Sequence, residues 1–318
     1  MTIQVTDQRS LLPLKKIVFI ALTLSFAFSL SLSYQQVKND ELLKLNTLER
    51  EFATPFMIPE QKELADPEEV YPLLLKAAME AKVNLFRASR YYRPEKHIEI
   101  TKYLLLTGET NFYDHVELAE GRTLQAEETR DRRLFLSSTQ TKNKNQVGRI
   151  DYFDPEQRIT IQSLQASYDY LPVHGRYFAE AREEKQVRLF LDQLSREFNT
   201  YLRDREGKKA HSFTPADFQP PEAFTKPEER FLTLTDLSSL QMDQYILFAV
   251  TLLLLIYYIF NRAKQIGILK MHGLSNLRLW WIVVGRLITT AVGVIALGSV
   301  LFGLTLHEPV KFLAEAFN

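Results

Sequence analysis

Residues 245–260 read YILFAVTLLLLIYYIF, and this stretch decides the fold class because it contains no charged side chain. A helix of this length in a soluble core normally keeps a polar stripe, and this one has none. It therefore predicts a helix that crosses a membrane, which we assign to residues 244–260; a buried core helix is the alternative. Tyr245, Tyr257 and Tyr258 lie near its ends, where aromatic side chains meet lipid headgroups.

Two further apolar stretches predict a multi-pass membrane protein. Residues 17–34 are 18 uncharged residues, which is near the lower limit for crossing a hydrocarbon core of about 30 Å. We assign residues 17–37 to a transmembrane anchor, with a cleaved signal peptide as the alternative. Residues 279–306 form the third span and contain one charge, Arg286. Because a cation is costly inside a bilayer, Arg286 either extends to the membrane surface or forms an ion pair.

The distribution of basic residues predicts the orientation. Residues 1–16 carry a net charge of +2, residues 261–278 carry +4 with no acid, and residues 38–243 carry −6. Basic residues near the ends of spans stay in the cytoplasm, so we expect the N-terminus and residues 261–278 inside the cell. The large segment 38–243 and the tail, residues 307–318, are then expected outside.

The segment 38–243 is long enough to bury a core of its own. Its patterns predict a stalk helix at 39–52 and amphipathic helices at 67–83 and 181–203. Strand-like stretches lie at 84–92, 97–106, 132–139 and 158–166. Residues 204–230 contain a charge cluster and four prolines, which predicts a linker or a long loop. The predicted fold class is therefore an α-helical membrane protein with three transmembrane helices and a large extracytoplasmic α+β domain, located in the cell membrane.

Several kinds of chemistry are absent from the sequence. The chain has no cysteine, which excludes disulfides, thiol nucleophiles and cysteine-based metal sites. None of the six histidines forms an i, i+4 pair, and neither a serine-nucleophile motif nor a glycine-rich phosphate loop occurs. The zero net charge argues against nucleic-acid binding. We therefore expect no catalytic residues, no metal and no cofactor in this chain.

The short segment between the second and third spans is the most informative part of the sequence. Residues 261–278 read NRAKQIGILKMHGLSNLR, an apolar set placed between basic residues. A helix here would lie on the membrane surface and end at Gly273, since glycine commonly terminates helices. The alternative is an interfacial turn that only anchors the two spans.

This segment resembles the coupling-helix region of ABC permeases of the FtsX/MacB type. The matching sequence is Lys264-Gln265-Ile266-Gly267-Ile268-Leu269-Lys270-Met271-His272-Gly273-Leu274-Ser275. The order of elements also agrees, and within this type the chain looks most like the bacteriocin-associated integral membrane proteins of Gram-positive bacteria. Residues 121–129, GRTLQAEET, resemble a segment of such outer domains.

The resemblance implies that a separate cytoplasmic ABC ATPase, which binds the ATP, docks on residues 261–278. The implied coupling positions are Lys264, Gln265, Ile266, Ile268, Leu269, Lys270, Met271, Gly273 and Ser275. Ile266, Leu269 and Met271 would fill a groove of the ATPase, while Lys264 and Lys270 orient the contact. The implied client is a peptide such as a bacteriocin, handled by mechanotransmission, in a homodimer or in a pair with a second half-permease.

The sequence departs from the family pattern at two places. Gln265 stands where the family has an acidic residue, so a salt bridge to the ATPase becomes a hydrogen bond. No fourth span follows before Asn318, so we expect a fragment, a frameshifted product or the N-terminal half of a split permease. The alternative functions are a membrane sensor that acts on an outer partner such as a cell-wall hydrolase, and a membrane-anchored outer enzyme.

Overall fold

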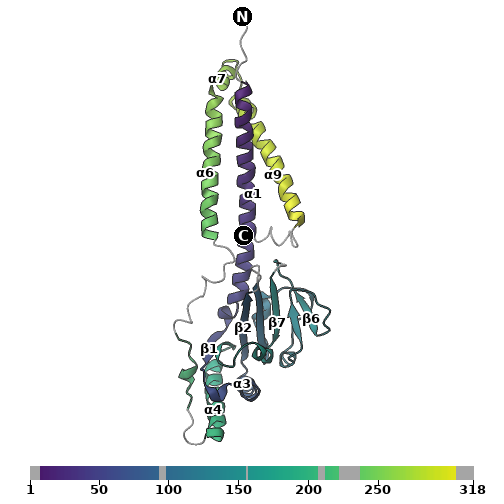
Figure 1. Cartoon of the computed structure of the whole chain (residues 1–318), viewed down its shortest axis with the longest axis vertical. Helices are drawn as coiled ribbons and strands as arrows, with labels where there is room; N and C mark the ends of the chain where they lie inside the picture. The colour runs from purple at the N-terminus through teal and green to yellow at the C-terminus, as the bar shows by residue number, and fades with distance from the viewer. Residues whose placement is uncertain (1–7, 93–97, 155–156, 207–211, 222–236, 306–318) are drawn as a thin grey trace. The chain divides into compact units, whose positions relative to one another are not determined.

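The computed structural model describes residues 8–92, 98–154, 157–206, 212–221 and 237–305 (Figure 1). The chain divides into two compact units. The membrane unit contains residues up to Asp40 and from Thr233 onward, and the α+β unit contains Glu41–Leu232. The tail 307–318, which we expect outside the cell, is not among the described residues.

The membrane unit contains the three helices that are long and apolar enough to cross a membrane, as the sequence predicts. They are α1 (Gln8–Thr47), α6 (Leu237–Asn261) and α9 (Arg286–Thr305), the last preceded by the short helix α8 (Asn276–Trp280) and a π-helical segment, η9 (Trp281–Gly285). Helix α1 has 40 residues and is therefore about 60 Å long, twice the thickness of a hydrocarbon core of about 30 Å. Its continuation beyond the apolar stretch is the predicted stalk.

Polar side chains join α1 to α6 within the membrane unit. The hydroxyl groups of Ser25 and Thr251 share a buried hydrogen bond of 2.8 Å, and Gln244 Nε2 donates to Ser29 Oγ at 2.8 Å. Hydrogen bonds of this kind stabilise helix pairs in lipid. An apolar cluster joins all three spans through Val18 of α1, Tyr258 of α6 and Leu287 of α9.

The α+β unit is built on one mixed sheet of eight strands in the order β1-β8-β2-β3-β7-β5-β6-β4. The strands are β1 (Thr54–Ile58), β2 (Asn84–Tyr92), β3 (Ile98–Leu105), β4 (Leu118–Gly121), β5 (Phe135–Ser137), β6 (Gln146–Ile150), β7 (Arg158–Ser163) and β8 (Gly175–Glu180). The pairs β3/β7 and β5/β6 are parallel, and the other paired strands are antiparallel. The four strand-like stretches of the sequence contain β2, β3, β5 and β7.

The sheet has an apolar core on each face. Helices α3 (Pro67–Ala81) and α4 (Glu184–Glu206) cover one face and bury residues such as Leu74 and Phe190 against it. Both helices lie within or close to the ranges predicted from periodicity. The other core contains Leu48, Phe86 and Phe112. It receives the end of α1 and the short helix α2 (Glu49–Phe52), so the predicted stalk forms, with a break at Leu48.

Of the two possibilities predicted for 204–230, a linker or a long loop, the structure has a packed loop with a 3-10 turn at residues 212–221. Phe213 and Phe218 are buried and pack against Phe198 of α4. Asn199 of α4 makes two hydrogen bonds to the backbone of Phe213. Its Nδ2 donates to the Phe213 carbonyl at 2.8 Å, and its Oδ1 accepts from the Phe213 N–H at 2.6 Å. The two aromatic side chains thus complete the core, and Pro215 begins the 3-10 turn η7 (Pro215–Phe218) that carries Phe218. Residues 207–211 and 222–230 lie outside the described residues.

Candidate functional site

The predicted coupling segment forms a separate short helix, α7 (Ala263–Met271), between α6 and α8. The helix ends in a Schellman motif, in which Gly273 N donates to the Lys270 carbonyl at 3.0 Å and Leu274 N to the Leu269 carbonyl at 3.4 Å. Gly273 has φ +78°, a conformation that favours glycine. The expectation that the helix ends at this residue is therefore confirmed.

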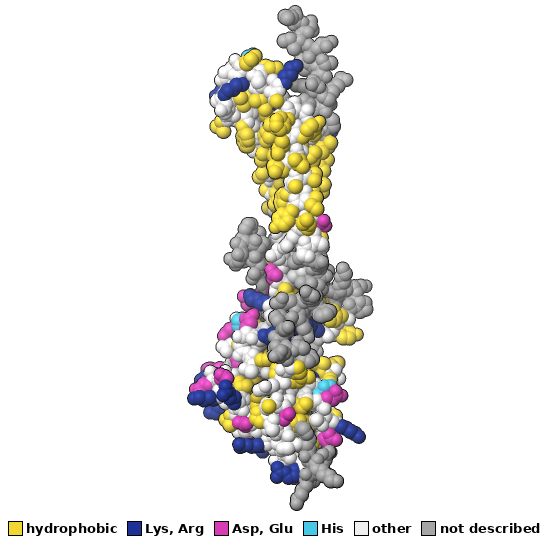
Figure 2. All heavy atoms as spheres, turned by 90° about the vertical axis from the view of Figure 1, so that its left-hand side faces the viewer, with side chains coloured by type: hydrophobic (Ala, Val, Ile, Leu, Met, Phe, Trp, Pro, Cys, Tyr) yellow, Lys and Arg dark blue, Asp and Glu magenta, His cyan; other side chains and the backbone are white. Residues whose placement is uncertain are grey.

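Helix α7 presents apolar and basic side chains to its surroundings. Met271 is 83% exposed and Ile268 47% exposed, and they lie three residues apart on one face, as positions i and i+3 do. Lys264 and Lys270 are also exposed. Figure 2 shows hydrophobic side chains over the membrane unit, with basic side chains gathered at the end that carries α7. Such a mixed surface fits a protein partner with a partly apolar groove.

The structure distinguishes among the predicted docking residues. Ile266 and Leu269 are half-buried, whereas Ile268 and Met271 point outward. Gln265 accepts a hydrogen bond from Arg262 at 2.5 Å, so its amide is already engaged within the chain. Ser275 instead begins helix α8, where its carbonyl accepts from the Leu279 N–H at 3.0 Å.

One exposed apolar residue near α7 is missed by the sequence reasoning. Leu277 of α8 is 77% exposed. It belongs to a separate short helix, so the periodicity of residues 263–271 could not have identified it. The outward apolar surface of this segment therefore consists of Ile268, Met271 and Leu277.

Arg286 directly follows the π-helical segment η9. Its side chain is exposed, and it forms no ion pair with any of the residues that the structure describes. Extension to the membrane surface and an ion pair with another chain both stay predictions for this charge. Gly285 leaves room for two tryptophan rings, because a Cβ atom there would lie 2.7 Å from Trp281 Cε3 and 2.9 Å from Trp280 Cζ3.

A buried ion pair joins the end of the stalk to the central strand of the sheet. Lys102 of β3 and Glu49 of α2 are each 2% exposed, and Lys102 Nζ lies 2.6 Å from Glu49 Oε2. The same ammonium group lies 3.4 Å from the Asn46 carbonyl of α1. Burial lowers the pKa of Lys102, while the Glu49 carboxylate opposes that shift.

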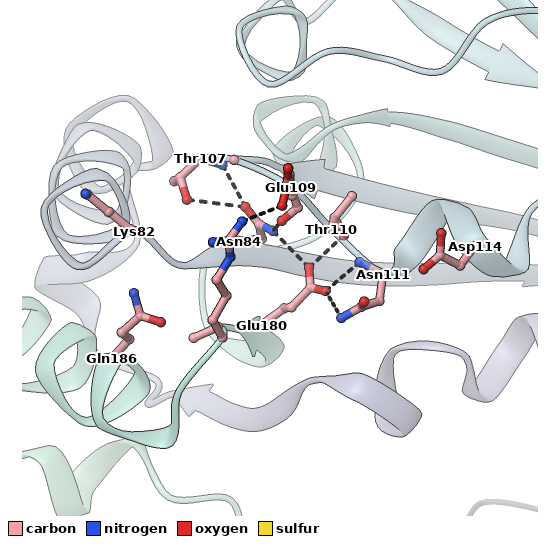
Figure 3. A pocket seen from close by; sticks show the side chains of 12 residues that line it. Lys82, Asn84, Thr107, Glu109, Thr110, Asn111, Asp114, Glu180 and Gln186 are labelled. Atoms are coloured by element: carbon pink, nitrogen blue, oxygen red, sulfur yellow. Dashed lines mark hydrogen bonds and ion pairs between the residues drawn. The ribbon is translucent and has the colours of Figure 1, made fainter.

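A polar pocket of about 730 Å³ lies in the α+β unit (Figure 3). It is bounded by the end of α3, the start of β2, the loop 107–111, the end of β8 and the start of α4. Its central carboxylate is Glu180, which is 3% exposed. Glu180 accepts hydrogen bonds from Asn84 Nδ2 at 2.9 Å, Thr110 Oγ1 at 2.6 Å, Asn111 N at 2.7 Å and Asn111 Nδ2 at 2.9 Å. These bonds compensate the burial of the charge and fix the loop.

The stretch 121–129, which resembles an outer-domain segment of the permease family, has a structural role. Gly121 (φ +82°) leaves no room for a side chain, because a Cβ atom would lie 2.4 Å from the Val147 carbonyl oxygen. Arg122 forms a two-pronged ion pair with Glu128, with both N···O distances at 2.6 Å. This pair and the Gln125 N–H lower the pKa of Glu128 to about 2. The close contact at Gly121 and the ion pair Arg122–Glu128 therefore fix the loop that follows β4.

The structure offers no metal cluster in the part of the chain that it describes: no three histidine or acidic side chains there lie close enough to hold an ion. Three candidate sites remain in the described part of the chain: the outward surface of α7, the buried pair Lys102–Glu49, and the polar pocket around Glu180. The first was expected from the sequence, and the other two depend on contacts between distant residues.

Comparison with known proteins leaves the chain without an assigned family. No protein-family model matches the sequence, and no curated protein matches it. Among solved structures, the chain is similar to the crystal structure of the extracellular domain of the noncanonic ABC-type transporter YknZ from Gram-positive bacteria, with 12% identity and a TM-score of 0.27. The match covers 50% of this chain and 96% of that one. At this level the similarity assigns neither a family nor a function.

Proposed function

We propose that this chain is a permease subunit, or the N-terminal half of one, in an ABC system that acts on a peptide. A cytoplasmic ATPase docks on α7 and supplies the ATP chemistry, while the α+β unit works outside the cell. The chain acts as a homodimer or together with a second half-permease. The observation that carries the proposal is the exposed, capped helix α7 between two membrane-crossing helices, on the residues that resemble the coupling motif.

The chemistry of α7 supports docking of a protein rather than simple anchoring. Anchoring favours apolar residues turned toward lipid with basic residues at the headgroups. Here the half-buried Ile266 and Leu269 serve that attachment, and Ile268 and Met271 stay free for a partner. Methionine suits such a contact because its flexible side chain adapts to a groove. Lys264 and Lys270 then orient the partner by charge, an effect that salt weakens.

Helix α1 is continuous between the two units, so it transmits a movement of the membrane unit to the α+β unit. Its residues up to Asp40 belong to the membrane unit, and residues 41–47 belong to the α+β unit. A shift of this helix caused by the ATPase therefore reaches the sheet through the stalk end. There Leu42 and Leu48 are buried and Glu49 is paired with Lys102. No channel through the bilayer is needed for this mode of action.

The experiment is a co-purification of the chain with the ABC ATPase encoded nearest its gene, in mild detergent. The wild type is compared with a variant that carries Ile268→Asp and Met271→Asp. We expect the wild type to retain the ATPase and the variant to lose it, because two buried carboxylates would lack partners in the docked state. A further variant, Gly273→Val, should bind but fail to stimulate ATP hydrolysis, since valine disfavours the φ of +78° that ends α7.

A matched control carries Leu189→Asp and Met79→Asp, which places the same charges on exposed apolar positions of the α+β unit. This control should retain the ATPase. Equal retention by all variants would contradict docking on α7. Absence of the ATPase from every sample would favour the sensor function, in which an outer partner such as a cell-wall hydrolase co-purifies instead.

A further inference from the structure

We propose that the polar pocket of the α+β unit binds a short zwitterionic peptide segment, with Lys82 receiving its carboxylate and Asp114 its ammonium group. The inference deepens the proposed function, because it provides a binding site for the peptide client. It rests on four features of the pocket: a preformed polar floor, an unusual backbone conformation at Lys82, separated opposite charges and a lining of mainly polar side chains.

The floor of the pocket is preformed. Besides the hydrogen bonds of Glu180, Asn84 Oδ1 accepts from Thr107 N at 2.8 Å, and Asn84 Nδ2 donates to the Glu109 carbonyl at 2.8 Å. Asn84 is buried, so its amide and the Glu180 carboxylate hold the loop 107–111 from beneath. A fixed loop lets a ligand bind without first ordering the rim of its site.

Lys82 occupies a conformation that ordinarily belongs to glycine. It has φ +55°, and within the described residues it is the one non-glycine residue with positive φ. It ends α3 in the same Schellman motif that ends α7, with Lys82 N donating to the Met79 carbonyl at 3.3 Å and Val83 N to the Ala78 carbonyl at 3.0 Å. Helix α7 uses Gly273 at the equivalent position. A lysine here is therefore less favourable for the fold than glycine, and what it adds is an ammonium group at the pocket.

The charges of the pocket are separated. Lys82 and Asp114 lie at opposite sides of it (Figure 3), and neither forms an ion pair with another described residue. Glu109 and Arg182, which also line the pocket, are paired with each other. A ligand with one anionic and one cationic group satisfies both unpaired charges. A polyanion would meet the carboxylates of Asp114, Glu109 and Glu180. A lipid chain would meet mainly polar side chains, since Ala181 is the one apolar side chain among the described lining residues.

The test uses the full chain in detergent micelles, without the ATPase, and measures binding of oligoglycines of two to six residues by titration calorimetry. These peptides carry one free ammonium and one free carboxylate, and the series of lengths covers the unknown separation of the two charges. We expect saturable binding with an optimum length. Lys82→Gly and Asp114→Asn should each weaken it about three- to tenfold, the range for an exposed charge-assisted hydrogen bond.

Chemically blocked peptides identify which group meets which residue. An N-acetylated peptide has no ammonium group for Asp114, so it should bind the wild type and Asp114→Asn equally. A C-amidated peptide has no carboxylate for Lys82, so it should bind the wild type and Lys82→Gly equally. Lys82→Gly should melt at the same or a higher temperature than the wild type, which separates a binding role from a structural one. Lys142→Gly, a change at an exposed lysine outside the pocket, is the matched control and should not alter affinity.

Three outcomes would overturn the inference. They are a lack of binding at millimolar peptide for every length, equal affinity of the wild type and both pocket variants, and tight binding of poly(glycerol phosphate) that Asp114→Asn strengthens. Because the ATPase is absent from this assay, its result is independent of docking on α7.

Discussion

Replacing Lys102 by methionine should strongly destabilise the α+β unit. Lys102 is the one hydrogen-bond donor to the Glu49 carboxylate in the described part of the chain, and both side chains are 2% exposed. Methionine fills much the same volume but leaves that carboxylate buried and unpaired. Breaking a buried pair in this way costs about 3–5 kcal/mol. In a unit of this size, that corresponds to a fall in melting temperature of about 6–20 °C.

The double variant with Glu49→Met and Lys102→Met should behave differently. It removes both charges and leaves an apolar contact, which is on average neutral or stabilises by about 1–4 kcal/mol. Its melting temperature should therefore match or exceed that of the wild type. Arg122→Met breaks an exposed pair and serves as the control, with an expected loss below about 1 kcal/mol.

Circular dichroism in the tyrosine region follows this unfolding, because both tryptophans lie in the membrane unit and do not report on the sheet. Amide exchange at β3 (Ile98–Leu105) provides a second, local measurement. Equal melting temperatures for the Lys102→Met variant and the wild type would refute the reasoning. A double variant as unstable as the single one would also refute it, since shape rather than charge would then explain the loss.

Three further predictions concern other contacts. Gly121→Ala should destabilise the α+β unit by about 1–3 kcal/mol, because of its φ of +82° and the clash with the Val147 carbonyl; an unchanged melting temperature would contradict this. The pKa of Glu128 is lowered to about 2, so its stabilising effect is complete above its unfolded pKa of about 4.3 and is lost as the pH falls toward 2. Glu128→Gln should therefore show a shallower decline in melting temperature across that range, and parallel curves would argue against the ion pair. Gly285→Val should displace the rings of Trp280 and Trp281 and shift their emission, whereas an unchanged spectrum would show that the segment accommodates a side chain.

The sequence predicted the elements that depend on neighbouring residues. Helix α3 begins at Pro67, the start of the predicted range 67–83, and Asp66 caps it, since Asp66 Oδ1 accepts from the Glu68 N–H at 3.0 Å. Strands β1, β4, β6 and β8 were missed. These strands are short or mix polar and apolar residues. Their extended conformation depends on pairing with neighbouring strands. Phe213 and Phe218 lie in the segment predicted as a linker or a long loop, because prolines dominate the local sequence. Their burial depends on contact with α4, which the local sequence does not show.

The sequence by itself determined that three stretches are long and apolar enough to cross a membrane, and that a basic segment with a glycine stop joins two of them. Hydropathy, charge and helix termination are properties of contiguous residues, so they can be read along the chain. Only the tertiary structure decided which side chains of α7 face outward, and that Lys102 meets Glu49. It alone brought Asn84 to Glu180, which are 96 positions apart, to build the floor of the pocket. Such contacts arise because a buried charge or amide is costly without hydrogen bonds or an ion pair, and in these two cases the partners come from distant segments.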